Sequence, residues 1–309
     1  MHRMAGGTYH CQQCLATRLP VISGAGIVNE RYAHGNSARE RAIILGDAAN
    51  EPQPLQRDKL MRILITNDDG VYSPGIAALA EVATHFAEVR VVAPHVEMSS
   101  AAHAISASTP LSYTRTPMPF GEAYRVNGTP ADCVSVGINR WDHVDVVLSG
   151  INLGSNLGNA MWHSGTLAGA RQAALLGVRG ISLSTPTMEV EPDFAALKPW
   201  VATVLEFLLP ASELKLVNVN LPPRAPKGVL WTRQSVRHYD GTVVPTKDPF
   251  GRPRFWISVV PIEEVEEGTD RWAMDRGYVS MTPLRLDLTD DEQLAMAQSK
   301  HPLEKILFT

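Results

Sequence analysis

The stretch that decides the fold is Met61-Arg-Ile-Leu-Ile-Thr-Asn-Asp-Asp-Gly-Val-Tyr-Ser-Pro-Gly-Ile76. Residues 63–65 form a short aliphatic run, which is typical of a buried strand, and the turn residues 67–70 end that run. Two neighbouring acids, Asp68 and Asp69, therefore come directly after a strand. In an open parallel sheet, ligands bind at the carboxyl ends of the strands, so this turn is the first candidate for a site.

The two acids cannot stand side by side without compensation. Two carboxylates about 4 Å apart repel by roughly 4 kcal/mol at an effective dielectric constant near 20. The pair therefore needs a shared proton or a nearby positive charge. A divalent cation is the simplest source of that charge. The alternative is an ordinary Asx turn in which one acid caps the next helix.

Strands and helices are expected to alternate downstream of this turn. Ser73 and Pro74 are typical of a helix start, and apolar residues at helical spacing from 76 to 86 predict the helix itself. The same reasoning predicts further strands at 89–93, 124–126, 144–148, 180–184 and 216–221, and further helices at 134–138, 164–176 and 194–208. This order predicts an α/β fold with right-handed crossovers and a mostly parallel sheet that helices cover on both faces.

From Pro222 onward the pattern changes. Strands are predicted at 228–233, 254–260 and 278–288, with polar loops between them and a final helix at 290–299. We expect residues 61–222 to form the core of a domain spanning 61–309, and residues 223–309 to form a β-rich extension that mediates oligomer contacts.

Residues 1–60 show no sustained periodicity of 2 or 3.6, and we expect a poorly ordered amino-terminal extension there. Cys11 and Cys14 have His2 and His10 nearby, but a structural zinc site needs a second ligand pair at regular spacing, so we interpret the pair as accidental. Because Met61 directly precedes the first convincing strand, we expect the functional protein to begin there.

The amino-acid composition argues against several classes of protein. The 309 residues are 44% hydrophobic, which is enough for a substantial core. A formal net charge of -4 gives no sign of a surface for nucleic-acid polymers. The sequence has no apolar run long enough to span a membrane, and its three cysteines are too few for a disulfide framework. We therefore expect a cytoplasmic protein.

The second informative stretch is Ser149-Gly-Ile-Asn-Leu-Gly-Ser-Asn-Leu-Gly158, which follows the strand at 144–148. Its three glycines allow the backbone to approach a ligand closely. Asn152 and Asn156 supply amide donors and carbonyl oxygens. Taken singly, such an asparagine is equally well explained as a turn residue.

Two other segments add to this edge of the sheet. The polar loop 95–108 contains Ser99, which taken alone reads as an ordinary solvated serine. The helix that begins in His163-Ser-Gly-Thr166 has free backbone N–H groups at its start, which suit a phosphate. We predict a site because these loops converge above one edge of the sheet. Each residue taken alone is only weak evidence for a site.

Carboxylate, hydroxyl and amide oxygens without a His or Cys cluster favour Mg²⁺ or Mn²⁺ over zinc. Hydrolysis of a phosphate ester is the reaction that such a site suggests. We assign phosphate binding to four residues, Asn156, Ser164, Gly165 and Thr166. The general base stays unassigned.

Seven motifs together resemble the SurE family, the survival-protein-E nucleotidases, over roughly residues 61–290. The motifs are Asn67-Asp-Asp-Gly70, the Ser99 loop, Gly128-Thr-Pro-Ala-Asp-Cys133, Ser149-Gly-Ile-Asn152, Asn156-Leu-Gly158, His163-Ser-Gly-Thr166 and Gly277-Tyr-Val-Ser-Met-Thr-Pro283. The resemblance implies a Rossmann-like core and a 5′-nucleotidase that releases phosphate from nucleoside 5′-monophosphates, with 3′-monophosphates and short polyphosphate as further substrates.

The resemblance also implies the cofactor and its ligands. One divalent cation per subunit, Mg²⁺ or Mn²⁺, would be held by Asp68, Asp69, Ser99 and Asn152, with the two acids as the catalytic residues. It further implies a homodimer or homotetramer built partly through carboxyl-terminal exchange.

One departure from the family pattern is visible at residues 95–98, where His-Val-Glu-Met replaces the usual acid and basic residues. The alternative function is therefore a catalytically altered protein of the same fold that binds nucleotide and metal. Three other classes fit less well. A receiver domain needs an acceptor Asp after the third strand, a haloacid-dehalogenase-type phosphatase needs Asp-x-Asp, and a dinucleotide oxidoreductase needs its glycine fingerprint.

Overall fold

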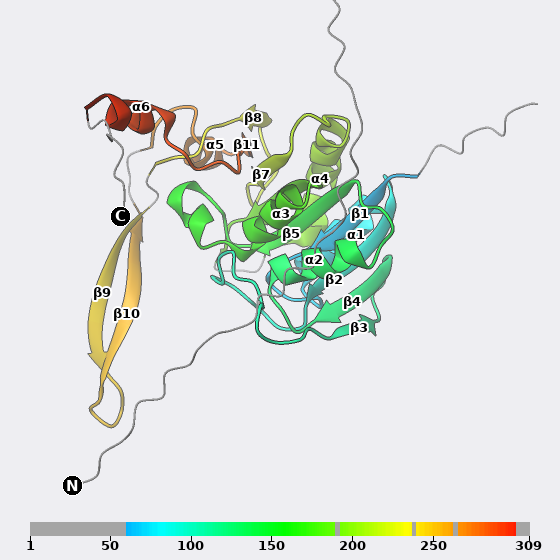
Figure 1. Ribbon diagram of the computed structural model, residues 1–309, viewed down its shortest axis with the longest axis horizontal. Helices are drawn as coiled ribbons and strands as arrows, with labels where there is room; N and C mark the ends of the chain where they lie inside the picture. The colour runs from blue at the N-terminus through cyan, green and yellow to red at the C-terminus, as the bar shows by residue number, and fades with distance from the viewer. Residues whose placement is uncertain (1–59, 189–191, 237–238, 262–264, 301–309) are drawn as a thin grey trace, which may run out of the picture. The chain divides into compact units, whose positions relative to one another are not determined.

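The computed structural model describes residues 60–188, 192–236, 239–261 and 265–300 (Figure 1). All of these residues belong to one compact unit. The predicted amino-terminal extension, with Cys11 and Cys14, lies outside the described residues. Among the described helices, none has both the length and the apolar character needed to cross a bilayer.

The predicted α/β architecture is confirmed. The strands are β1 Arg62–Thr66, β2 Glu88–Pro94, β3 Tyr113–Thr116, β4 Glu122–Val126, β5 Val146–Leu153, β6 Arg179–Thr185, β7 Leu216–Asn220, β8 Val229–Trp231, β9 Tyr239–Lys247, β10 Pro253–Pro261 and β11 Val279–Pro283. The helices are α1 Pro74–Ala83, α2 Pro130–Asn139, α3 Gly165–Leu175, α4 Phe194–Leu208, α5 Asp270–Asp275 and α6 Asp291–Lys300, with a 3-10 helix η1 at Gly158–Trp162.

Nine strands form one sheet in the order β3-β4-β2-β1-β5-β6-β7-β11-β8. The six strands from β4 to β7 in this order are parallel, and the antiparallel strands β3 and β11 flank them. The chain builds outward from β1 in one direction through β2 and then in the other through β5. The strand order therefore reverses between β1 and β5, which is where open α/β sheets bind ligands.

Helices pack on the two faces of the sheet. Helices α1 and α4 contact each other, and their apolar residues share a core with β1, β2, β5 and β6. Helices α2 and α3 also contact each other, and the smaller clusters to which they contribute lie on the other side. β1 and β5 are covered on both sides, and this burial explains their aliphatic sequence.

The opening stretch folds as predicted. Residues 63–66 of β1 are buried, and α1 begins after Ser73, whose hydroxyl accepts a hydrogen bond from the N–H of Ile76 at 3.4 Å. The side-chain amide of Asn67 donates to Ser73 Oγ at 2.8 Å and to the carbonyl of Gly70 at 3.0 Å. Gly70 has φ +96°, which other L-residues rarely adopt. The acidic turn is therefore a fixed structure between β1 and α1.

Some boundaries differ from the prediction. β5 continues through Leu153, so the first half of the glycine-rich stretch is strand, not loop. The second helix begins at Pro130, earlier than predicted, in a capping box formed by Thr129 as N-cap and Asp132 at the third position. The strand predicted at 278–288 ends at Pro283. Strands β3 and β9 and helix α5 were not predicted.

The carboxyl-terminal segment adds strands to the main sheet and also forms a separate hairpin. β11 pairs with β7 and β8 pairs with β11, so part of the predicted extension completes the main sheet. β9 and β10 pair only with each other as an antiparallel hairpin, drawn in yellow and orange in Figure 1. Helix α6 buries none of its residues against the described part of the chain.

Candidate active site

The two acids lie at the carboxyl end of β1, next to β5, where the strand order reverses. Asp68 is buried, with 4% of its surface exposed, and Asp69 is half-buried. Among the described residues, no Lys, Arg or His forms an ion pair with either carboxylate. No ion pair among the described residues therefore supplies the compensating charge that the two acids need.

Asp68 is held against the start of α3. The hydroxyl of Thr166 donates to its Oδ1 at 2.5 Å, and a Cβ added at Gly165 would lie 2.9 Å from the Asp68 side chain. A glycine is required there because the helix start and the carboxylate approach so closely. Burial raises the pKa of Asp68, although hydrogen bonds from Thr166 and the local backbone oppose this shift.

Asp69 faces β5. Its Oδ2 accepts a hydrogen bond from the N–H of Leu153 at 3.3 Å. Burial, followed by the charge of Asp68, raises its pKa from 3.8 to about 7, while the Leu153 bond acts in the opposite direction. The pKa values of both acids are thus shifted upward. Carboxyls in this condition suit a site that a metal ion completes.

The loop after β2 is tied over the acidic turn. The N–H of Met98 donates to the Asp68 carbonyl at 2.7 Å, and the N–H of Ala102 donates to the His163 carbonyl at 3.1 Å. Ser100 and Ala102 have positive φ values of 60° and 52°. Non-glycine residues in this region carry strain of about 1 kcal/mol or more. The loop conformation that presents Ser99 is therefore maintained by contacts on both sides.

Asn152 is placed by an irregularity in β5. Its pairing with β6 shifts register between Ser149 and Asn152. The Asn152 side chain is buried, and its amide nitrogen donates to the Gly154 carbonyl at 2.6 Å. Since the nitrogen is engaged, the side-chain oxygen is the atom left to accept a donor or a cation.

A cavity of about 250 Å³ opens beside Asp69 and Ser99, and neither Asp68 nor Asn152 is among its lining residues. Asp69, Glu97, Ser99 and Leu153 line one part of it. The remaining lining residues come from the start of α1 and from α4, and they are Ser73, Pro74, Gly75 and Phe194. The structure thus brings Asp69 and Ser99, which are distant in sequence, to one cavity.

The phosphate-binding candidates fall into two groups. Ser164 is the N-cap of α3, and its hydroxyl accepts from the N–H of Leu167 at 2.9 Å. Thr166 and Gly165 lie against Asp68, as described above. In this arrangement their backbone N–H groups, not the Thr166 hydroxyl, are the groups suited to a phosphate.

Asn156 lies in a buried polar network instead. Its side-chain nitrogen donates to Ser184 Oγ at 2.8 Å, and its backbone N–H donates to Asn220 Oδ1 at 2.9 Å. The side chains of Asn218 and Asn220 both donate to its carbonyl, at 2.8 and 3.1 Å. A direct contact between the Asn156 amide and a phosphate would require it to leave Ser184.

These supporting asparagines and Ser184 were not predicted as part of the site. The alternation Leu216-Val-Asn-Val-Asn220 was a usable signal, because asparagines inside a buried strand must find partners. The hydrogen bond of the Ser99 hydroxyl to Glu97 Oε1, at 2.7 Å, had no such signal.

The donor set fits a hard divalent cation. No three His, Cys, Asp or Glu side chains within the described ranges gather into a metal site. A cation at the acidic pair would have two carboxylate donors and would need neutral oxygens to complete its shell, for which the Ser99 hydroxyl and the Asn152 side-chain oxygen are the candidates. Oxygen-only donor sets of this kind suit Mg²⁺ and Mn²⁺.

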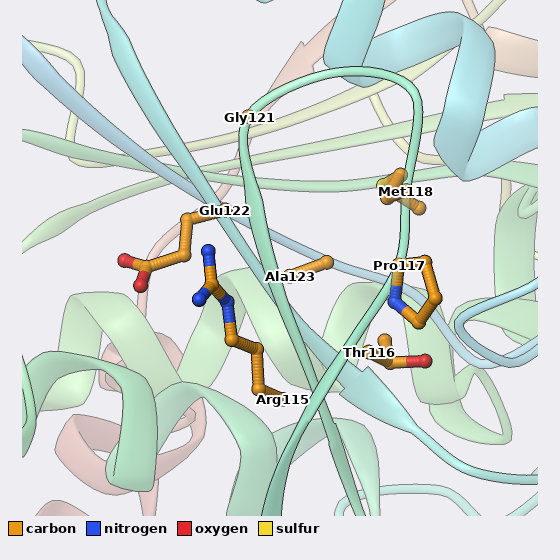
Figure 2. Close-up of a pocket in the computed structure, with 7 residues that line it drawn as sticks. All are labelled: Arg115, Thr116, Pro117, Met118, Gly121, Glu122 and Ala123. Carbon is orange, nitrogen blue, oxygen red and sulfur yellow. The ribbon is translucent and has the colours of Figure 1, made fainter.

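A larger cavity of about 410 Å³ lies at the β3–β4 edge (Figure 2). Figure 2 shows its lining, with Arg115 and Glu122 on the strands and Met118 in the loop between them. None of the predicted site residues lines this cavity. It is therefore separate from the candidate active site.

Comparison with known proteins agrees with this geometry. A family model described as Survival protein SurE matches residues 63–241. A Thermus thermophilus protein named 5′-nucleotidase SurE 1 is 47% identical over 236 residues, covering 74% of this chain and 93% of that protein. A Deinococcus radiodurans protein named 5′-nucleotidase SurE is 38% identical over 253 residues, covering 78% of this chain and 94% of that protein.

A solved structure gives the same result. The crystal structure of the SurE protein from Aquifex aeolicus superposes with a TM-score of 0.69 at 37% sequence identity, covering 77% of this chain and 98% of that chain. The matches in sequence and in fold both extend over nearly the whole length of the relatives. The chain belongs to the SurE family.

Proposed function

We propose that this protein is a 5′-nucleotidase that depends on a divalent cation and releases phosphate from nucleoside 5′-monophosphates. One observation carries the proposal: two acids with raised pKa values meet at the sheet's switch point, beside the start of α3, without a protein cation among the described residues. The names of the relatives, which are 38–47% identical, support the nucleotidase activity.

In this proposal one Mg²⁺ or Mn²⁺ per subunit is held by Asp68, Asp69, Ser99 and Asn152. When bound, the cation supplies charge neutralisation at the phosphoryl group and polarises water. Thr166 keeps Asp68 oriented through its hydroxyl. The start of α3, capped by Ser164, directs its backbone N–H groups and its dipole at the phosphate. We also propose Asn156 as a phosphate contact. Of the four phosphate-binding candidates it has the least structural support, because its side-chain amide is bonded to Ser184.

The cavity beside Asp69 suits a small phosphate ester more than a polymer. Its volume of about 250 Å³ is close to that of small-ligand sites. We propose nucleoside 5′-monophosphates as the main substrates, with 3′-monophosphates and short polyphosphate as further ones. A cytoplasmic location stays an expectation from cysteine content.

The test is phosphate release from nucleoside 5′- and 3′-monophosphates and polyphosphate, with Mn²⁺, with Mg²⁺ and with chelator. We expect Asp69→Asn to lower kcat by about 10³-fold, because one charged ligand is lost from the site. Asp142→Asn removes an exposed acid elsewhere and serves as the matched control. Equal activity with and without chelator would refute the metal mechanism.

One outcome would favour the alternative function. If the wild type binds nucleoside monophosphates and Mn²⁺ but releases no phosphate, the chain is a catalytically altered binding protein of the same fold.

We also propose a homodimer or homotetramer. The support is the exposed apolar surface of the carboxyl-terminal segment, where Phe255, Trp256 and Ile257 are 67%, 69% and 84% exposed. Apolar patches of this kind mark interaction surfaces.

A further inference from the structure

Glu97 lies between the loop after β2 and the acidic turn. Its carboxylate accepts the hydroxyl hydrogen of Ser99 at 2.7 Å, and it lines the same cavity as Asp69 and Ser99. A Cβ added at Gly70 would lie 3.6 Å from the Glu97 backbone nitrogen, so the two loops pack directly on each other. Glu97 is therefore held at the candidate metal site, although no family assignment given above includes it.

The chemistry of Ser99 explains what such a carboxylate does. A serine hydroxyl has two lone pairs and one hydrogen, so it can bind a cation through oxygen while it donates its hydrogen elsewhere. An ionised acceptor gives a stronger hydrogen bond than a neutral one, and it increases electron density on the hydroxyl oxygen. Residues that hold a ligand in this way typically change metal affinity by 10- to 100-fold.

The fixed loop backbone and the Glu97 carboxylate together restrict the Ser99 hydroxyl. Ser99 and Glu97 are both exposed, so without the bond the hydroxyl would rotate freely in water. The loop itself is fixed by the bonds from Met98 to Asp68 and from Ala102 to His163. The backbone thus sets the position of Ser99, and Glu97 sets the direction of its hydroxyl hydrogen.

We propose that Glu97 is a positioning residue for the metal site, which acts by orienting the Ser99 hydroxyl so that its oxygen faces the cation. It is not proposed as a ligand, since it does not join Asp68 and Asp69 in any three-residue cluster among the described side chains. This inference rests on the proposed function, because it needs a cation at the acidic pair.

The test measures binding of Mn²⁺ directly, by the electron paramagnetic resonance signal of the free ion, in the full-length protein without nucleotide. We expect Glu97→Ala to weaken Mn²⁺ binding by about 10-fold. We expect Glu97→Gln to weaken it by only about 2- to 3-fold, because the amide oxygen still accepts the hydrogen bond without the charge. Glu206→Ala removes an exposed glutamate on α4 whose carboxylate makes no hydrogen bond with the described residues, and it should bind like the wild type.

The double variant separates positioning from simple charge. If Glu97 acts through Ser99, then Glu97→Ala has no further effect in a Ser99→Ala background. A loss of the same size in both backgrounds would overturn the proposal, because the carboxylate would then act directly on the cation. Wild-type affinity in Glu97→Ala would also overturn it.

Failure of the metal site itself gives a different result. If Asp69→Asn binds Mn²⁺ as tightly as the wild type, the proposed metal site falls and this inference falls with it. If Asp69→Asn loses binding and Glu97→Ala does not, only the inference about Glu97 is wrong. Thermal unfolding of each variant checks that the fold is intact, and an exposed position such as Glu97 should tolerate both substitutions.

Discussion

Strands β5 and β10 are both rich in β-branched residues, yet they lie in opposite environments. Leu148 in β5 is fully buried between β1 and β6, with helices on both faces of the sheet, whereas Ile257 in β10 is 84% exposed. Residue type predicted both strands. What it did not predict is burial, which depends on how many neighbouring layers the chain supplies to each strand.

The largest expected effect of this contrast is on folding. We expect Leu148→Ala to lower the free energy of unfolding by about 3 kcal/mol, because it leaves a cavity in a packed core. Ile257→Ala, a deletion of similar size at an exposed site, should change it by about 0.5 kcal/mol or less. Urea unfolding of both variants measures the difference. Equal losses would show that the hairpin is buried in solution.

The difference in burial between β5 and β10 would be smaller if a second copy of the chain covered the hairpin. If a second copy covers the hairpin, Trp256→Glu should weaken self-association by about 100-fold, since an aromatic ring is lost and a charge is placed in the contact. Sedimentation velocity over a range of concentrations measures this change. Thr242→Glu adds the same charge to the hairpin without removing a ring, and it should have a smaller effect. An unchanged assembly in Trp256→Glu would exclude this face as the contact.

The pKa values of two acids, one in each region, shift in opposite directions. Burial and Asp68 raise the pKa of Asp69 to about 7. At Asp248, beside the hairpin turn, burial acts upward, but hydrogen bonds from Arg252, Phe250 and Arg254 outweigh it and lower the pKa. The folded state therefore favours a neutral Asp69 and an ionised Asp248.

The metal-free protein should lose stability as pH rises. Asp69 binds its proton more tightly in the folded state than in the unfolded state, so its stabilising effect is complete below about pH 4 and is lost by about pH 7. Because the side chain is only half-buried, we expect this loss to be about 1–2 kcal/mol. Unfolding in chelator at pH 5 and pH 8, compared with Asp69→Asn, isolates the effect. A slope that survives in Asp69→Asn would assign the loss to other groups.

The smallest expected effect concerns two glycines with nearly the same backbone conformation. Gly177, just after α3, and Gly251, in the hairpin turn, have φ values of 79° and 78°, and neither has an atom within 4 Å of an added Cβ. An alanine at either position costs about 1 kcal/mol of backbone strain. Gly177→Ala should lower global stability by that amount. Gly251→Ala should leave global stability unchanged and speed amide hydrogen exchange in the hairpin alone. Loss of global stability in Gly251→Ala would show that the hairpin unfolds together with the core.

Much of the core was predictable because its signals agree with one another. β1, the turn of Asn67 to Gly70 and the Ser73-Pro74 helix start all point to the same arrangement, and the structure confirms it. The helix predicted at 164–176 is likewise found, as α3 at Gly165–Leu175. Local pattern and tertiary packing do not compete at these positions.

The unpredicted elements lack such agreement. β3 has only four residues, Tyr113-Thr-Arg-Thr116, and its two central side chains are exposed, so no apolar alternation marks it. β9 contains Pro245 and polar residues, and it is held only by pairing with β10. The glycines after Leu148 indicated a loop, whereas the pairing of Asn152 with Ser184 extends β5 beyond them.

Within the candidate site, the sequence indicated residue types but not the contacts between them. Paired acids, a loop serine and a helix start can be recognised in sequence. The bonds from Thr166 to Asp68 and from Ser99 to Glu97 depend on distances between segments that only the folded chain defines.

The contact between the acidic turn and the loop after β2 has a practical meaning for protein engineering. Met98 bonds to the Asp68 carbonyl, and Gly70 packs on Val96 and Glu97, so each loop is part of the other's support. Libraries that randomise one loop alone will mostly return variants with a misplaced partner. Residues 67–73 and 94–102 should instead be exchanged between homologues as a single cassette, which keeps the contacts between the two loops around the proposed metal site.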